Sequence, residues 1–66
     1  MKLTVNGQAY EHRGVGRLAE LLRELDAPPD RTAVMVNEEV IPADKRQAVT
    51  LKESDRIEVI AFAGGG

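Results

Sequence analysis

The chain opens with two short runs in which apolar and polar residues alternate. The runs cover residues 3–5 and 8–10, and only Asn6-Gly7 lies between them. An Asn-Gly pair in this position indicates a β-hairpin with a type I′ turn, because both central residues of that turn need a positive φ. The two-residue turn also sets the register, so that Leu3 faces Tyr10 on one side of the sheet. We therefore expect Tyr10 to be a core residue with its hydroxyl at the rim, and not a catalytic phenol.

A helical pattern follows the hairpin. Apolar residues recur at intervals of three and four, which is typical of one face of an amphipathic helix: Val15, Leu18, Ala19, Leu21, Leu22 and Leu25. Gly14 and Gly16 come just before it; without a third glycine and a Walker lysine they indicate a turn that opens a helix, not a phosphate loop. Pro28-Pro29 ends the pattern. The spacing predicts a helix over residues 16–26.

The second half of the chain predicts further strands. Residues 33–36 are apolar and suit a largely buried strand. Residues 40–42 suit a strand at the sheet edge, because Pro42 cannot donate to a ladder. The polar residues 43–50 are expected to be irregular with one helical turn. Residues 56–62 are the richest in β-branched side chains, so we expect them in the centre of the sheet, parallel to the first strand.

This order of elements predicts the architecture. One amphipathic helix has one apolar face, and one sheet can cover it, which gives a two-layer α+β domain. A hairpin, a helix, a strand, an edge strand and a last central strand form the β-grasp, or ubiquitin-like, arrangement, with a mixed four- to five-stranded sheet packed on one main helix. We expect a single domain over residues 1–62 and a glycine-rich tail over residues 63–66.

Composition limits the function. The chain has 66 residues and a net charge of −2, with acidic and basic residues interspersed. Nucleic-acid binding needs a clustered basic face, so it is not expected. A chain this short builds a thin core, which leaves little room for an active site. There is no cysteine, and we expect no metal site and no bound cofactor. Without an apolar leader or a membrane span, we expect a cytoplasmic protein that is a monomer when free.

The last residues carry the candidate chemistry. Gly64, Gly65 and Gly66 have no side chains, so a tail made of them can thread into a cleft that excludes any other residue. The tail ends in the α-carboxylate of Gly66, and a terminal glycine has no stereocentre to scramble when that carboxyl group is activated. A frayed end is the plain alternative.

Taken together, these features resemble the ThiS-type sulfur carriers of thiamine biosynthesis. The resemblance spans the whole chain and rests on four pieces in order: Val15-x-x-Leu18-x-x-Leu21-Leu22, residues 36–42, Leu51-x-x-x-Asp55-x-Ile57-Glu58-Val59, and the ending Phe62-Ala63-Gly64-Gly65-Gly66. Two positions depart from the pattern. Ser54 stands where relatives usually carry glycine, and Ala63 stands where a larger aliphatic residue is common.

The resemblance implies a mechanism in which the chain is a cosubstrate and not an enzyme. A ThiF-like adenylyltransferase, using its own ATP and Mg²⁺, would adenylate Gly66. Sulfur from a persulfide donor would convert the adenylate to a thiocarboxylate, and a ThiG-like thiazole synthase would receive the sulfur. Carriage for molybdenum-cofactor or cysteine synthesis, conjugation of Gly66 to target proteins, and a plain interaction domain with an idle tail are the alternatives.

Other polar and apolar positions are assigned minor or structural roles. His12, the only histidine, is expected to be a solvent-exposed bystander, Asp55 a turn residue and Glu58 a surface charge. Alternation along the last strand places Ile60 and Phe62 on the face away from the helix. Met35 is expected to point outward in the same way. These three residues, Met35, Ile60 and Phe62, form a predicted partner-docking patch beside the tail.

Overall fold

A computed structural model describes residues 1–62. Its elements are β1 (Lys2–Val5), β2 (Gln8–Glu11), α1 (Leu18–Glu24), β3 (Thr32–Val36), β4 (Glu39–Val40), the 3₁₀-helix η1 (Ala43–Ala48) and β5 (Arg56–Ala61). None of the helices in this described part is long and apolar enough to cross a membrane.

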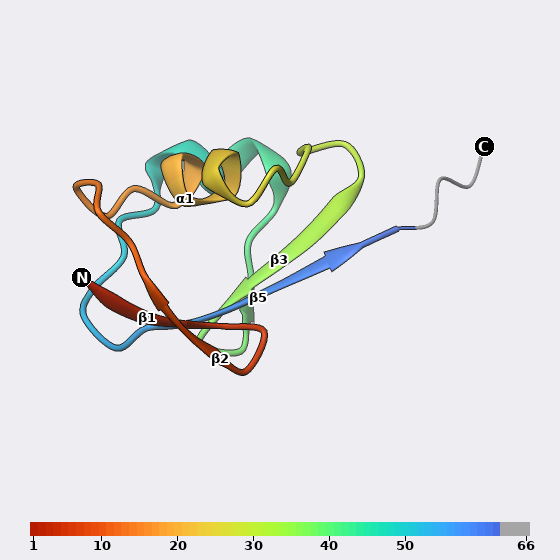
Figure 1. Cartoon of the computed structure of the whole chain (residues 1–66). Coiled ribbons are helices and arrows are strands. Elements are labelled where there is room, and N and C mark those ends of the chain that lie inside the picture. Colours follow the sequence, from red (N-terminus) through yellow and green to blue (C-terminus); the bar gives the residue numbers. More distant parts are fainter. Residues whose placement is uncertain (63–66) are drawn as a thin grey trace.

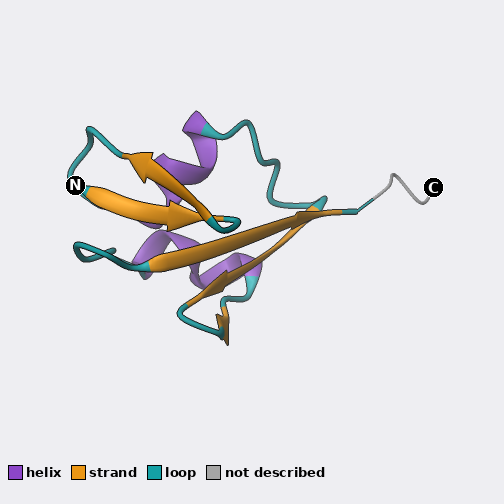
Figure 2. Ribbon diagram, turned by 60° about the horizontal axis from the view of Figure 1, so that its bottom comes forward, coloured by secondary structure: helices purple, strands orange, loops and turns teal. Residues whose placement is uncertain are grey.

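The strands form one mixed sheet in the order β2-β1-β5-β3-β4. β5 lies in the centre, parallel to β1 and antiparallel to β3, as the sequence predicted. Both helices cover the same face of the sheet, and the other face is open (Figures 1 and 2). The α+β, β-grasp prediction is confirmed.

The hairpin has the predicted turn and register. Asn6 and Gly7 have φ values of 50° and 80°, and Leu3 pairs with Tyr10. The side chain of Asn6 adds a contact that the sequence did not predict. Its Oδ1 accepts a hydrogen bond of 2.8 Å from the Val59 N–H, and its Nδ2 donates to the Val59 carbonyl at 3.2 Å. The amide thereby continues the β1–β5 ladder by one step after β1 has turned away.

The helix is shorter than predicted at its N-terminal end. It begins at Leu18, and Val15 is 71% exposed in the preceding loop, so its assignment to the apolar face was wrong. Residues 16 and 17 pair with a neighbouring segment instead of entering the helix. Gly16, with φ of 92°, accepts a hydrogen bond from the Leu51 N–H, and Arg17 forms an isolated bridge with Thr50.

At the other end the helix stops before the prolines require it to. Asp26 adopts a φ of 57°, and the Ala27 N–H donates to the Leu22 carbonyl at 2.9 Å. The Asp26 N–H donates to the Arg23 carbonyl at 3.1 Å. These two bonds form a Schellman motif, which satisfies the last carbonyls of a helix. The chain therefore leaves α1 through this motif and reaches the prolines already extended.

The core lies between α1 and the covered face of the sheet. Eight apolar residues from five segments are buried in it: Leu3, Val5, Leu18, Leu21, Leu22, Val34, Leu51 and Ile57. Tyr10 packs against them while its hydroxyl donates to Glu24 at the rim, as predicted. No element supplies more than three of these residues, so the core forms only when the helix and the strands come together.

The turn before β5 contains one of the two departures from the family pattern. Ser54 has a φ of 72°, a conformation that costs a residue with a Cβ roughly 1–2 kcal/mol relative to glycine. Asp55 stabilises the turn as predicted. Its carboxylate accepts hydrogen bonds from the Lys52 N–H at 2.7 Å and from the Asn37 side chain at 2.9 Å.

Candidate functional site

The predicted working residues lie at the end of β5. Gly64, Gly65 and Gly66, and Ala63 before them, are outside the described residues. What the structure does place is the point from which they start. The end of β5 reaches beyond the other strands, on the side of the molecule opposite the N-terminus (Figure 1).

Only β3 holds the last part of β5. Ala61 pairs with Thr32, and the Phe62 N–H donates to the Arg31 carbonyl at 2.8 Å. On its other side β5 pairs with β1 only as far as Ile57, and the Asn6 amide then covers Val59. The strand is therefore anchored up to Phe62, so the four residues that follow begin from a fixed position.

Beside this anchor the open face of the sheet carries exposed apolar side chains. Ile60 and Phe62 are 54% and 56% exposed, and their placement in a docking patch stays a prediction. Met35 is half-buried. The structure adds Val40, which is 64% exposed and pairs directly with Met35. We call Met35, Val40, Ile60 and Phe62 the apolar face. Sequence reasoning missed Val40 because its pairing partner is set by the β3–β4 turn.

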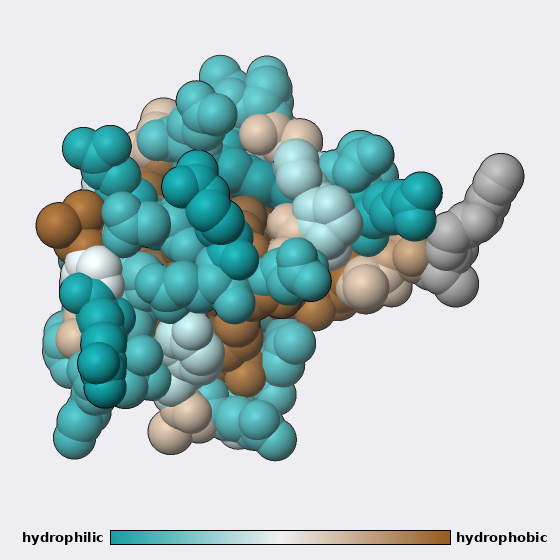
Figure 3. All heavy atoms as spheres, turned by 45° about the horizontal axis from the view of Figure 1, so that its top comes forward, coloured by the Kyte–Doolittle hydropathy of each residue, from teal (hydrophilic) through white to brown (hydrophobic). Residues whose placement is uncertain are grey.

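The surface seen from the helix side is mostly hydrophilic. In Figure 3 hydrophobic atoms show between the hydrophilic ones, and some of them line the end of the molecule beside the grey trace. A shallow hollow of about 240 Å³ lies between the end of α1 and the end of β5. Its lining includes Leu25, Pro28, Ala61 and Phe62. The working end of the molecule thus offers a concave apolar surface as well as the apolar face.

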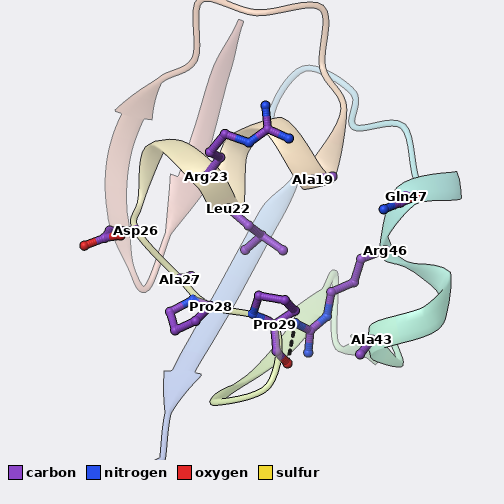
Figure 4. Close-up of a pocket in the computed structure, with 10 residues that line it drawn as sticks. All are labelled: Ala19, Leu22, Arg23, Asp26, Ala27, Pro28, Pro29, Ala43, Arg46 and Gln47. Atoms are coloured by element: carbon purple, nitrogen blue, oxygen red, sulfur yellow. Dashed lines mark hydrogen bonds between the residues drawn. The ribbon is translucent and has the colours of Figure 1, made fainter.

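A second hollow, of about 560 Å³, lies between α1 and η1 (Figure 4). Arg46, which is only 6% exposed, reaches from η1 across its edge. Its guanidinium donates to the Thr32 carbonyl at 2.7 Å and to the Pro29 carbonyl at 3.3 Å. This arginine ties η1 to the chain before β3. This contact could not be predicted from the sequence, because Arg46 stands in a polar stretch typical of a solvated loop.

His12 is not the exposed bystander that the sequence predicted. Its side chain is completely buried, and its Nδ1 lies 3.0 Å from Glu24 Oε2. Burial opposes ionisation of Glu24, but the hydrogen bonds from His12 and Tyr10 outweigh burial and lower the pKa of this carboxyl group. The hydrogen bond to Glu24 raises the pKa of the Tyr10 hydroxyl. The sequence misled here because the loop after β2 folds back over the ring.

Asp55 and Glu58 do not form a carboxylate pair for catalysis. Asp55 is buried in its turn, and Glu58 stands exposed on β5 opposite Met35. Both roles agree with the sequence-based interpretation. The hollow beside the tail has no histidine or carboxylate in its lining apart from Asp26. The described residues at this end therefore offer an apolar surface and an anchored strand.

A family model described as the ThiS family matches residues 3–66, which includes the final glycine. The chain belongs to the ThiS family. ThiS proteins are small carriers, in agreement with a site that offers a tail and a surface. The chain is similar to the thiamine biosynthesis protein ThiS of Geobacter metallireducens, whose crystal structure matches over the full length of both chains, with 36% identity and a TM-score of 0.82.

Two curated relatives are larger proteins. The chain is 38% identical to a thiazole synthase of Magnetococcus marinus and 33% identical to one of Paramagnetospirillum magneticum. In both cases all of this chain is covered, but it spans only 20% of the relative. A ThiS-like segment therefore occurs in proteins that carry the name thiazole synthase.

Proposed function

We propose that this ThiS-family chain carries sulfur as a thiocarboxylate on Gly66 and delivers it to a thiazole synthase. The observation that carries the proposal is the family match through the final glycine, on a fold whose central strand leads directly to that tail. A ThiF-like adenylyltransferase, which supplies ATP and Mg²⁺, activates the carboxylate. The chain itself contributes the end group, the tail and a docking surface.

The chemistry follows from the poor reactivity of a carboxylate. Attack of the Gly66 carboxylate on the α-phosphate of ATP forms an acyl-adenylate and releases pyrophosphate. The terminal sulfur of a protein persulfide then attacks the acyl carbon, and AMP leaves. This gives an acyl disulfide between Gly66 and the donor. A second thiol then attacks the sulfur atom that belongs to the donor. This forms a disulfide between that thiol and the donor and releases the Gly66 thiocarboxylate.

The relatives support a thiazole synthase as the receiver. Two proteins of that name contain a segment similar to the whole of this chain. A carrier that shares a polypeptide with its receiver is held at high local concentration beside it. We infer that the present chain meets a separate or adjoining ThiG-like synthase in the same role. Thiazole synthase then takes the sulfur into its product, and the tail returns as a carboxylate.

We further propose that the apolar face docks the activating enzyme. Its exposed members Ile60 and Phe62 lie at the end of the central strand β5, and Val40 lies further along the sheet on the edge strand β4, beside Met35. Exposed apolar patches of this kind mark protein interaction sites. Docking there fixes the position of Phe62, so the remaining four residues need only reach a nearby active site.

Phe62→Asp tests the docking surface. Because Phe62 is 56% exposed, a charge there is expected to leave the melting temperature nearly unchanged. Docking would remove the new charge from water, and we expect this cost to weaken binding to the ThiF-like enzyme by roughly 10-fold or more. Titration calorimetry measures the affinity, and Glu39→Lys on the short exposed strand β4 is the matched charge-change control. Unfolding of Phe62→Asp would show that Phe62 belongs to the core.

Pyrophosphate exchange tests the proposed function itself. The ThiF-like enzyme with Mg²⁺, ATP and labelled pyrophosphate should exchange label into ATP only when the chain is present. A chain lacking Gly65 and Gly66 should give the background rate while keeping its fold, because both residues follow the anchored strand. Full exchange with the truncated chain would refute adenylation at Gly66.

A further inference from the structure

The buried ring of His12 is held by one carboxylate and faces a second. Its Nδ1 lies 3.1 and 3.0 Å from the two oxygens of Glu24. A carboxylate accepts hydrogen bonds and cannot donate them, so Nδ1 must carry the proton. The Tyr10 hydroxyl donates to the same carboxylate at 2.9 Å, which fixes Glu24 in place. Nε2 is therefore the ring atom left free to bind a further partner.

His12 Nε2 is buried and has no hydrogen-bond partner among the described residues. The polar atom it faces is Glu20 Oε1, at 3.6 Å. This distance exceeds the 2.7–3.2 Å of a hydrogen bond between nitrogen and oxygen. It agrees with two ligands of one ion, since bonds of about 2.0–2.2 Å to zinc separate the ligand atoms by roughly 3.3–3.6 Å at angles near tetrahedral. The two atoms thus lie at the separation expected of two ligands of one ion.

Gly14 lies directly beside His12 Nε2 and Glu20 Oε1. A Cβ on Gly14 would overlap Glu20 Oε1 and lie 2.8 Å from His12 Nε2. Gly14 does not have a positive φ, so the position needs glycine for space and not for its backbone conformation. Glycine at this position leaves the space beside the unpartnered nitrogen and the carboxylate free of a side chain. We take this as an indication that the space holds a ligand.

We propose that His12 Nε2 and Glu20 bind a zinc-like divalent transition-metal ion, with Glu24 orienting the ring from behind. The ligand atoms of the three residues lie within 4.8 Å of one another. A carboxylate on the far nitrogen of a metal-bound histidine is the usual second-shell partner, because it fixes the tautomer and raises the basicity of the ligand. The side chain of Glu20 is 40% exposed, so water can reach the ion and complete its coordination.

Such an ion would stabilise the domain by linking the hairpin to α1. Glu20 and Glu24 lie one turn apart on α1, whereas His12 follows β2, so the ion joins the hairpin to the helix. A domain of this size with no disulfide gains from a staple of this kind. The sequence-based expectation of no metal site rested on the lack of cysteine and on an exposed His12, and His12 is buried. The site lies away from the tail and is independent of the proposed carrier function.

The test is a zinc titration of the full chain without a histidine tag. The melting temperature should rise by about 4–8 °C at a zinc concentration roughly five times the dissociation constant. The His12 Nε2 resonance should shift while Nδ1 keeps its proton. Mg²⁺ should give neither effect, because imidazole is a poor ligand for that ion.

Matched variants separate the site from general zinc binding. Glu20→Gln should abolish both effects, since it removes one ligand from a half-exposed position without disturbing the core. Gly14→Ala should do the same by displacing Glu20. Glu39→Gln, which removes an exposed carboxylate elsewhere, should respond like the unchanged protein. An equal rise in Glu20→Gln, or no response of His12 to zinc in the unchanged chain, would overturn the proposal.

Discussion

Adding even a few residues after Gly66 is expected to abolish sulfur carriage completely. The added residues convert the terminal carboxylate into an amide, which cannot be adenylated. In the proposed function they also place side chains in a tail whose entry into a narrow cleft depends on Gly64, Gly65 and Gly66 having none. The measurement is growth without thiamine of a strain whose only copy carries the extension.

A removable extension provides the control. When a protease site restores Gly66 as the last residue, thiocarboxylate formation in the reconstituted reaction should return to the level of the unchanged chain. Growth at the normal rate with the extension still attached, verified by the mass of the purified protein, would contradict a role for the free end group.

The largest expected effect on folding is that of Leu18→Ala. Leu18 is fully buried at the start of α1, and truncation of such a leucine costs about 2–5 kcal/mol. A domain of 66 residues has roughly 3–10 kcal/mol of stability in total. Much of the variant should therefore be unfolded at 37 °C. Urea denaturation followed by circular dichroism measures the loss.

Val15→Ala is the matched control, because the helical spacing predicted both residues to be on the same buried face. Val15 is 71% exposed in the structure, so its truncation should change the stability by less than about 0.5 kcal/mol. A loss as large as that of Leu18→Ala would show that Val15 packs in the core and that the helix begins earlier than Leu18.

The parts of the fold that the sequence predicted have local causes. Asn6-Gly7 can form only a few turns, and its turn sets the pairing of β1 with β2. The β-branched run of β5 indicated a central strand, as observed, and alternation within it predicted the exposed side chains of Ile60 and Phe62. In each case the signal lies within a few residues of the feature it predicts.

The errors come from contacts between distant segments. Residues 16 and 17 follow a helical pattern, but hydrogen bonding to residues 49–51 holds them outside the helix. His12 is polar and follows a strand, which suggests exposure, yet two carboxylates from α1 and the Gly14 loop enclose it. Arg46 is buried by carbonyl groups that lie 14 and 17 residues before it. None of these partners can be identified from the neighbouring sequence.

The same distinction between local and distant contacts holds for the candidate site. The glycine tail follows from the end of the chain, and three members of the apolar face, Met35, Ile60 and Phe62, follow from strand alternation. Val40 was missed, because its place beside Met35 depends on how β4 pairs with β3. A surface built from several strands can be identified only when the strand order and register are known.

The most direct measurement is the intact mass of the chain purified from its own cells without any C-terminal addition. We expect a population heavier by the exchange of one oxygen for sulfur, which alkylation of the thiocarboxylate moves to a new mass and which fragmentation locates at Gly66. A chain found only as the free carboxylate while the cells are making thiamine would contradict the account.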